Sequence, residues 1–174
     1  MRKLVSRVVA AIGLCRAPSK RVIVYVDGDS VSAHHVGIVL DYLRGRKAIS
    51  QVRVFGNINN RNVASWSSLA KRQGLVLRHM PRLVDGKNGA DIALATDAVE
   101  LHLTRPASAY ALIASDADFT PLVMRLKQDG AEVLGFGHRS APHTLRRVCT
   151  SFYQIIDLEK VDGEDGGKED WLAS

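Results

Sequence analysis

Short runs of apolar and β-branched residues recur along this chain and alternate with segments of helical spacing. Nearly continuous runs of this length are typical of strands that are covered on both faces of a sheet. The predicted strands are VIVYV (22–26), QVRVF (51–55), LVLR (75–78), AYALIA (109–114), AEVLGF (131–136) and a final FYQIID (152–157).

The intervening segments place apolar residues three or four positions apart, which predicts helices. One of them has clear ends, because Thr120 suits the N-cap, Pro121 the first helical position and Gly130 the position after the last turn. The other predicted helices cover 31–44, 62–73, 88 or 89 to 103, and 142–149. Strand and helix alternate with short connections, so we expect a three-layer α/β/α sandwich with a mainly parallel central sheet.

The length of 174 residues suits one domain. Residues 21–158 form the predicted domain, 1–20 an N-terminal extension with a short amphipathic helix, and 159–174 a flexible acidic tail. A hydrophobic content of 46% and a charged content of 24% are average for globular proteins and argue against disorder and membrane spanning. Cys15 and Cys149 match no metal-ligand spacing, so we expect reduced thiols and a cytoplasmic protein.

The formal net charge is +6, and five acids are concentrated in residues 161–174 against the single Lys168. The remainder of the chain is therefore more basic than the total suggests. A basic body suits a polyanion such as nucleic acid, although a solvated basic surface explains the charge equally well.

Four aspartates fall where the predicted sheet presents one edge. Asp27 follows the first strand, Asp116 and Asp118 follow the fourth, and Asp91 lies in the first turn of a helix. The carboxyl ends of parallel strands and the N-termini of the following helices meet at the same edge, so we expect the four to converge. Each one alone has a structural alternative, as a helix cap or a partner of a helix dipole.

Several ionised carboxylates in one pocket need a cation or must take up protons. Two unit charges about 4 Å apart repel by roughly 4 kcal/mol at an effective dielectric near 20. Oxygen ligands without His or Cys favour Mg²⁺ or Mn²⁺ over zinc. We therefore predict a metal site that supports hydrolysis at phosphorus.

Three blocks, VYVDGDS, GKNGADIALATDAVEL and IASDADFTPLVMRLKQDGAEVLGFG, resemble in this order the NYN domain family, a branch of the PIN-like nucleases that includes the LabA-like proteins. The resemblance covers about residues 21–158 and implies a PIN-like, Rossmann-like fold, an acidic metal-binding pocket and, in active members, endonuclease activity on RNA. The family's acids correspond to Asp27, Asp91, Asp116 and Asp118 as catalytic and metal-binding residues, and a further acid corresponds to Asp97.

Two positions depart from the family's pattern. Ser30 stands where the family often has Asn, and Ala117 where it often has Ser. Ala117 lacks a hydroxyl that could touch a metal-bound water or a phosphate. Neither change removes a carboxylate, but both favour the alternative of a non-catalytic module that binds RNA or protein.

Basic residues near the predicted edge are candidates for the RNA path. Lys87 and Arg139 are the predicted substrate-binding residues, with Arg61, His138, Arg146 and Arg147 as further candidates. Such side chains contact phosphates and give affinity without sequence specificity. We expect Trp66 and Phe119 to lie in the core, and His34 and His35 on the surface without an evident partner.

A rival enzymatic interpretation is a haloacid-dehalogenase-like phosphatase with Asp27 as nucleophile, since VYVDGDS also resembles a strand ending in Asp-x-Asp. The lysine and the Ser or Thr that this chemistry requires cannot be placed. We expect RNA as the partner, no organic cofactor and no membrane association, and assembly into homo-oligomers stays open.

Overall fold

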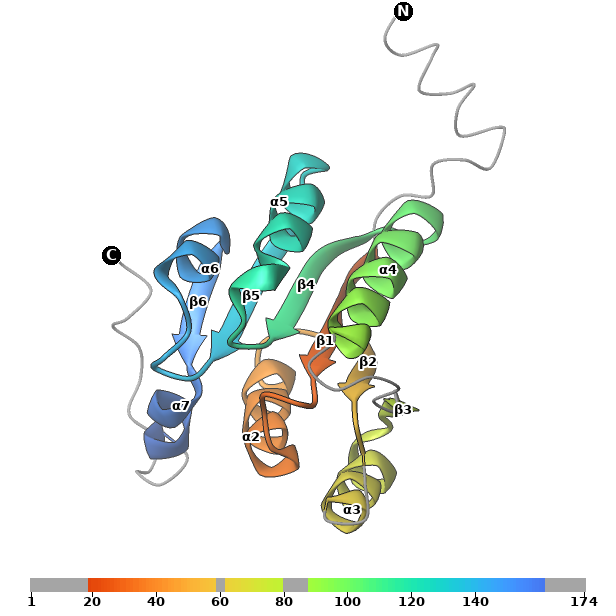
Figure 1. The fold of residues 1–174 in the computed structure, drawn as a ribbon, viewed down its shortest axis with the longest axis vertical. Helices are drawn as coiled ribbons and strands as arrows, with labels where there is room; N and C mark the ends of the chain where they lie inside the picture. Colours follow the sequence, from red (N-terminus) through yellow and green to blue (C-terminus); the bar gives the residue numbers. More distant parts are fainter. Residues whose placement is uncertain (1–18, 59–61, 80–87, 162–174) are drawn as a thin grey trace, which may run out of the picture.

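The computed structural model describes residues 19–58, 62–79 and 88–161, which form six strands and the helices that cover them (Figure 1). All six strands are parallel and lie in the order β3-β2-β1-β4-β5-β6. Their bounds are β1 Ser19–Asp27, β2 Ile49–Gly56, β3 Val76–His79, β4 Ala107–Ile113, β5 Glu132–Gly137 and β6 Ser151–Gln154.

Helices cover both faces of the sheet. Three of them, α2 (Ala33–Arg44), α3 (Val63–Gln73) and α7 (Ile155–Val161), pack on one face. The other face carries α4 (Gly89–Thr104), α5 (Thr120–Gln128) and α6 (His143–Val148). Figure 1 shows the two helical layers on either side of the strands. The three-layer sandwich with a parallel central sheet is confirmed.

The two-residue period of β1 explains the two cores. Val22, Val24 and Val26 pack in the core beneath α2 and α3, whereas Ile23 and Tyr25 pack in the core beneath α4 and α5. A strand with apolar residues on both faces is stable only where both faces are covered. The uninterrupted apolar pattern thus reflects the central position of β1.

The start of helix α5 (Thr120–Gln128) differs from the sequence-based prediction. Thr120 is the first residue of α5 and not its N-cap, because a 3₁₀ turn, Ala117–Phe119, precedes the helix. Asp116 caps this turn through its side chain. The N-cap position of α5 itself is occupied by Phe119, which makes no side-chain capping hydrogen bond.

The last predicted strand is only partly correct. Residues 151–154 form β6, but Ile155 begins helix α7, where Ile155 and Leu158 lie on the buried face, one turn apart. A short apolar run does not distinguish a strand from a buried helix. Helix α7 ends at Val161, so the first residues of the expected acidic tail are helical.

The predicted N-terminal helix and most of the acidic tail lie outside the described residues. Within the part that is described, no helix is long and apolar enough to cross a membrane.

Candidate metal-binding edge

The order of the strands creates a switch point between β1 and β4. The chain moves outward from β1 through β2 to β3, and then returns to β4 on the other side of β1. In open parallel sheets, ligands bind beyond the carboxyl ends of the strands at such a point. Asp27 ends β1, and Asp116 lies three residues after the end of β4.

Asp27 is held deep in this edge, with 4% of its surface exposed. Its Oδ1 accepts hydrogen bonds from the backbone N–H groups of Asp29 (3.1 Å) and Ser30 (3.4 Å). Burial raises the pKa of Asp27, and the hydrogen bonds from Ser30 and Asp29 oppose that rise. The side chain is thus fixed by its own loop.

Gly28 lets this loop lie against β2. Its backbone N–H donates to the Phe55 carbonyl at 2.7 Å, and a Cβ atom at Gly28 would lie only 3.1 Å from the same oxygen. Asp29 joins the two loops as well, because its Oδ1 accepts from the Asn57 N–H at 2.9 Å. Asp29 therefore stabilises the contact between the loop after β1 and the loop after β2.

Asp116 and Asp118 share a tight turn after β4. Asp116 Oδ1 accepts from the Asp118 N–H at 2.9 Å, and Asp118 Oδ2 accepts from the Asn88 side-chain amide at 3.0 Å. Asn88 immediately precedes α4, so this contact joins the start of that helix to the turn. Sequence reasoning named Asn88 only as a helix boundary and missed this contact.

Asp91 lies in the first turn of α4 and feels all the other acids at this edge. The pKa of Asp91 is raised to about 6, first by burial and then by the negative charges of Asp27, Asp116, Asp29 and Asp118. The structure therefore places Asp27, Asp116 and Asp118 close enough to Asp91 for their charges to act on it. They are not tightly clustered: among the described residues, no three His, Cys, Asp or Glu side chains are arranged as a metal site.

Asp97 has a different environment from these acids. It forms an ion pair with Arg53 of β2 and accepts a hydrogen bond from the Tyr25 hydroxyl at 3.1 Å. Both members of the ion pair are largely buried, which makes it a structural contact between α4 and the sheet. Asp97 is therefore a largely buried structural residue, and it is not among the acids that raise the pKa of Asp91.

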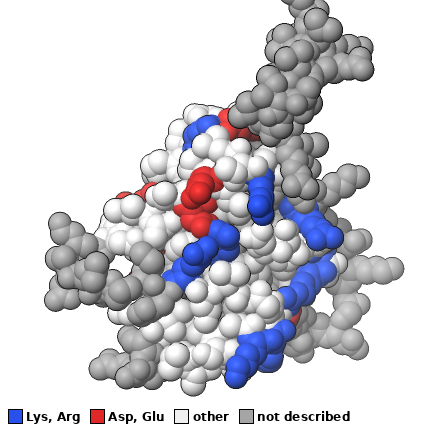
Figure 2. Space-filling model, turned by 90° about the vertical axis from the view of Figure 1, so that its right-hand side faces the viewer, with Lys and Arg blue, Asp and Glu red and all other residues white. Residues whose placement is uncertain are grey.

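Figure 2 shows the right-hand side of the molecule in Figure 1, with Lys and Arg side chains spread around a small acidic patch. A hollow of about 410 Å³ lies here between α4 and the open side of β2 and β3. Its charged lining residues are Arg53, Arg78, Asp97, Glu100 and Arg105. The lining carries charges of both signs, so this hollow is not a continuous basic path.

Basic residues flank the acidic edge on the β5 side. Arg139 is exposed, and its Nε donates to Gln154 Oε1 at 3.4 Å. The Arg146 guanidinium donates to the Arg139 carbonyl, which joins α6 to the same loop. Lys87 and Arg61 lie outside the described residues.

Ser115 connects the β5 loop to the acidic turn, a contact that sequence reasoning did not identify. Ser115 Oγ accepts from the His138 N–H at 2.9 Å. This close approach requires glycine at position 137, because a Cβ atom there would lie 2.6 Å from the Ala114 carbonyl oxygen. Ser115 directly precedes Asp116, so the β5 loop supports the position of the turn.

The histidines only partly match the sequence-based expectation. His34 is exposed, but His35 is half-buried and has its ring 5.1 Å from that of His138. Glu159 lies 3.6 Å from both His34 and His35. Burial, followed by the neighbouring His138, lowers the pKa of His35. These residues come from α2, the β5 loop and α7, so their proximity is a tertiary effect.

The aromatic predictions are confirmed. Trp66 and Phe119 are each 1% exposed. Trp66 is therefore a core residue, and base stacking on its ring is excluded. Phe119 anchors the acidic turn in the core beneath α5.

A crystal structure of a protein of unknown function from Vibrio parahaemolyticus has a similar fold, with a TM-score of 0.66 and 18% sequence identity over 83% of this chain and 98% of that chain. MurG of Acinetobacter baumannii is more distant, with a TM-score of 0.49 and 17% identity over 78% of this chain and 41% of that one. No curated protein sequence matches the chain. The model of the NYN domain, a family of the PIN-like nuclease group, matches residues 21–158, and the chain therefore belongs to the NYN domain family.

Proposed function

We propose that this protein is a divalent-metal-dependent endoribonuclease that hydrolyses phosphodiester bonds of single-stranded RNA. The observation that carries the proposal is the meeting of Asp27, Asp91, Asp116 and Asp118 at the switch point of a NYN domain. They come from three separate segments, and the charges of the other three contribute to the raised pKa of Asp91.

The donor set at this edge fits a hard cation. All four side chains offer carboxylate oxygens, and the charges that raise the pKa of Asp91 are those of Asp27, Asp116, Asp29 and Asp118. Mg²⁺ and Mn²⁺ prefer such oxygen ligands. Asp116 and Asp118 are exposed, and exposed side chains change rotamer readily, so the set can adjust around an ion.

The four aspartates would hold one or two ions. A bound divalent ion activates water at neutral pH and stabilises the departing oxygen in phosphodiester hydrolysis. The chain itself does the positioning: Asn88 orients Asp118, and Ser115 keeps the acidic turn against the β5 loop. Arg139 offers a cation beside the edge for the RNA backbone.

The decisive experiment compares wild type with Asp116→Asn on labelled single-stranded RNA in Mg²⁺ or Mn²⁺. Residues that only orient metal ligands change activity by about 10–100-fold, so loss of a ligand should lower the cleavage rate by more than about 100-fold. Glu100→Gln, an exposed acid on the same helix as Asp91, is the matched control and should cleave like wild type. Equal cleavage by wild type and Asp116→Asn would reveal a contaminating nuclease and refute the proposal.

A second candidate is a non-catalytic RNA-binding module. It is favoured by the absence of a three-residue metal group among the described side chains and by Ser30 and Ala117, which depart from the family's pattern. Single-turnover assays with Mn²⁺ and excess enzyme separate the two. RNA binding without any cleavage under these conditions would support the module.

A further inference from the structure

A cavity of about 270 Å³ lies between α2, β6 and α7, away from the four aspartates. This is slightly below the usual range of about 300–1,000 Å³ for drug-sized ligands, and it suits a ligand of the size of one nucleobase. The side chains that matter here are Tyr42 from α2, Arg46 from the turn after α2, Tyr153 and Gln154 from β6, and Asp157 from α7.

The aromatic side of this cavity is formed by tyrosine rings that pack on a buried phenylalanine. The Tyr153 ring stacks on the buried Phe136 ring, with centroids 5.2 Å apart and an interplanar angle of 23°. Tyr42 lies 5.6 Å from Tyr153 and also contacts Phe136. Burial is the main cause that raises the pKa of Tyr42 to about 12, so its phenol stays neutral. Rigid, neutral rings of this kind stack well with unpaired RNA bases.

The polar side of the cavity carries two different hydrogen-bonding groups. Gln154 Oε1 is engaged by Arg139 Nε, so the amide N–H₂ of Gln154 is the group left to donate. Asp157 is exposed in the first turn of α7, and its carboxylate only accepts. The cavity therefore pairs a donor with a two-oxygen acceptor.

Guanine matches this pair best among the four RNA bases. Its Watson–Crick edge has the O6 acceptor beside two neighbouring donors, N1–H and N2–H₂, which suit a carboxylate with two oxygens. Uracil offers only one donor on that edge. Arg46, whose Cζ lies 4.0 Å from the Tyr42 ring centroid, adds a cation for the attached phosphate.

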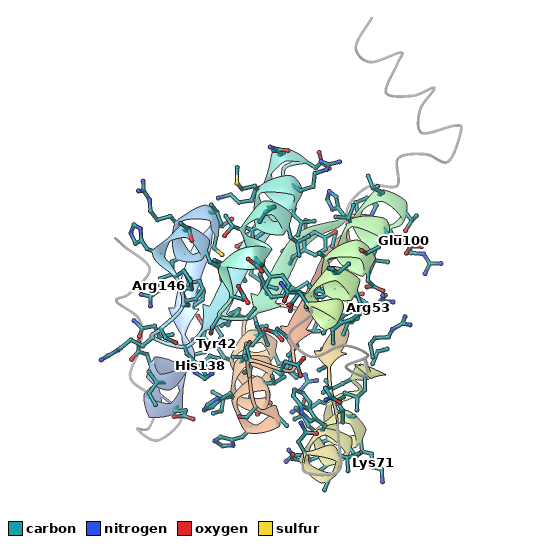
Figure 3. All side chains as sticks on the ribbon, in the orientation of Figure 1. Tyr42, Arg53, Lys71, Glu100, His138 and Arg146 are labelled. Atoms are coloured by element: carbon teal, nitrogen blue, oxygen red, sulfur yellow. The ribbon has the colours of Figure 1, made fainter. Side chains whose placement is uncertain are left out.

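One side of the cavity belongs to the same edge of the sheet as the aspartates, because Gln154 is the last residue of β6. Strand β6 is two positions from β4 in the sheet, which corresponds to roughly 10 Å at about 4.8 Å between strands. Arg139, from the loop after the intervening β5, contacts Gln154 between the two places. Figure 3 shows Tyr42 and His138 between α2 and the β6–α7 end of the molecule. A single strand lying along this edge would pass from the aspartates over Arg139 to the cavity.

We propose that the cavity between α2, β6 and α7 is a nucleobase subsite that prefers guanine in the RNA strand cut at the acidic edge. The inference rests on the proposed ribonuclease function and narrows its substrate. Tyr153 supplies the stacking surface, and Asp157 and Gln154 recognise the edge of the base.

The test measures binding of the four nucleoside 5′-monophosphates to the full chain by NMR, in the presence of a chelator so that no cleavage is needed. Guanosine monophosphate should shift the ring resonances of Tyr42 and Tyr153 and bind at least tenfold more tightly than uridine monophosphate. Asp157→Asn should remove most of this preference, and Glu100→Gln, an acid on the opposite face of the sheet, should retain it. Tyr153→Ala should weaken binding of all four nucleotides, whereas Tyr153→Phe should not.

Equal affinity for the four nucleotides, or shifts that leave both tyrosines unaffected, would overturn the subsite. The outcome is independent of the nuclease assay. Guanine-selective binding by a protein that does not cut RNA would leave the subsite in place and remove the nuclease. Metal-dependent cleavage without guanine-selective binding would support the nuclease and refute the guanine subsite.

Discussion

At the scale of single residues, the acidic edge depends on a conflict between burial and charge. Asp27 is buried and held by its own loop, while Asp91 has its pKa raised to about 6 by burial and four other carboxylates. A group whose pKa is higher in the folded than in the unfolded state stabilises the fold at low pH. That contribution is lost as the pH rises through the folded-state pKa. Ionised Asp91 therefore costs stability above about pH 6.

The loss of stability on ionisation of Asp91 predicts how the melting temperature of Asp91→Asn depends on pH. In the absence of divalent metal at pH 8, the variant should melt higher than wild type, and the difference should vanish near pH 4, where Asp91 is protonated. Solvent screening limits the gain, so we expect a rise on the order of 2–4 °C, which corresponds to about 1 kcal/mol in a domain of this size. Thermal melts at both pH values provide the measurement.

Divalent metal should stabilise wild type more than Asp91→Asn. Mg²⁺ or Mn²⁺ should raise the melting temperature of wild type more than that of Asp91→Asn, because the variant has lost a proposed ligand. A variant that melts lower than wild type in the absence of metal at pH 8 would show that Asp91 has a structural role instead.

At the scale of elements, the carboxyl ends of β4 and β5 hold the acidic turn in place. Gly137 ends β5, and its missing side chain leaves room for the Ala114 carbonyl and Ser115. The Ser115–His138 hydrogen bond then joins the two loops. The position of Asp116 therefore depends on how closely two neighbouring strand ends approach each other.

Gly137→Ala should disturb both the fold and the activity. The added Cβ would meet the Ala114 carbonyl oxygen at 2.6 Å and the Phe152 ring at 2.9 Å, so backbone must shift. Overpacking of this kind costs about 1–3 kcal/mol, and we expect RNA cleavage to fall as well because the acidic turn moves. Chemical denaturation and the cleavage assay measure the two effects.

Gly45→Ala is the matched control for this substitution. Gly45 has right-handed helical backbone angles at the end of α2, and a Cβ there would come no closer than 3.7 Å to another atom. It should keep both stability and activity. Wild-type behaviour of Gly137→Ala would mean that the β5 loop does not position the turn.

At the scale of the whole molecule, charge is unevenly distributed. The chain has a net charge of +6 although it carries an acidic edge and an acidic C-terminal segment. Arg139 lies beside the acidic edge, and further cations lie on the β2–β3 side, where Arg53 is paired with Asp97 (Figure 2). Affinity for RNA should therefore come from a few local phosphate contacts and depend on salt.

Arg139→Ala should weaken RNA binding equally for different sequences. Each phosphate contact to a single strand contributes about 0.7 to the slope of log K against log salt, so this variant should lose about that amount. Fluorescence anisotropy in a chelator gives the slope without cleavage. Arg105→Ala is the control. Arg105 follows the last turn of α4, whereas Asp91 of the acidic edge lies in its first turn, so this variant should keep the wild-type slope. An unchanged slope in Arg139→Ala would remove this residue from the RNA path.

The sequence by itself determined the architecture and the order of the acidic residues. Apolar runs such as VIVYV indicate covered parallel strands, because only a strand buried on both faces is apolar at every position. Asp27 and Asp116 follow two such runs, and Asp91 begins a helix, so topology alone places them at one edge. These inferences succeed because they depend on local patterns and on a general rule of sheet connection.

Tertiary structure decided which side chains meet. The pairing of Asp97 with Arg53, the contact of His35 with His138, and the cavity formed by Tyr42 and Tyr153 each join segments far apart in the chain. The start of α7 at Ile155 was likewise decided by packing against α2, since its apolar residues also suit a strand. Local periodicity carries no information on such contacts, because they depend on how helices lie across the sheet and on which side chains remain uncovered.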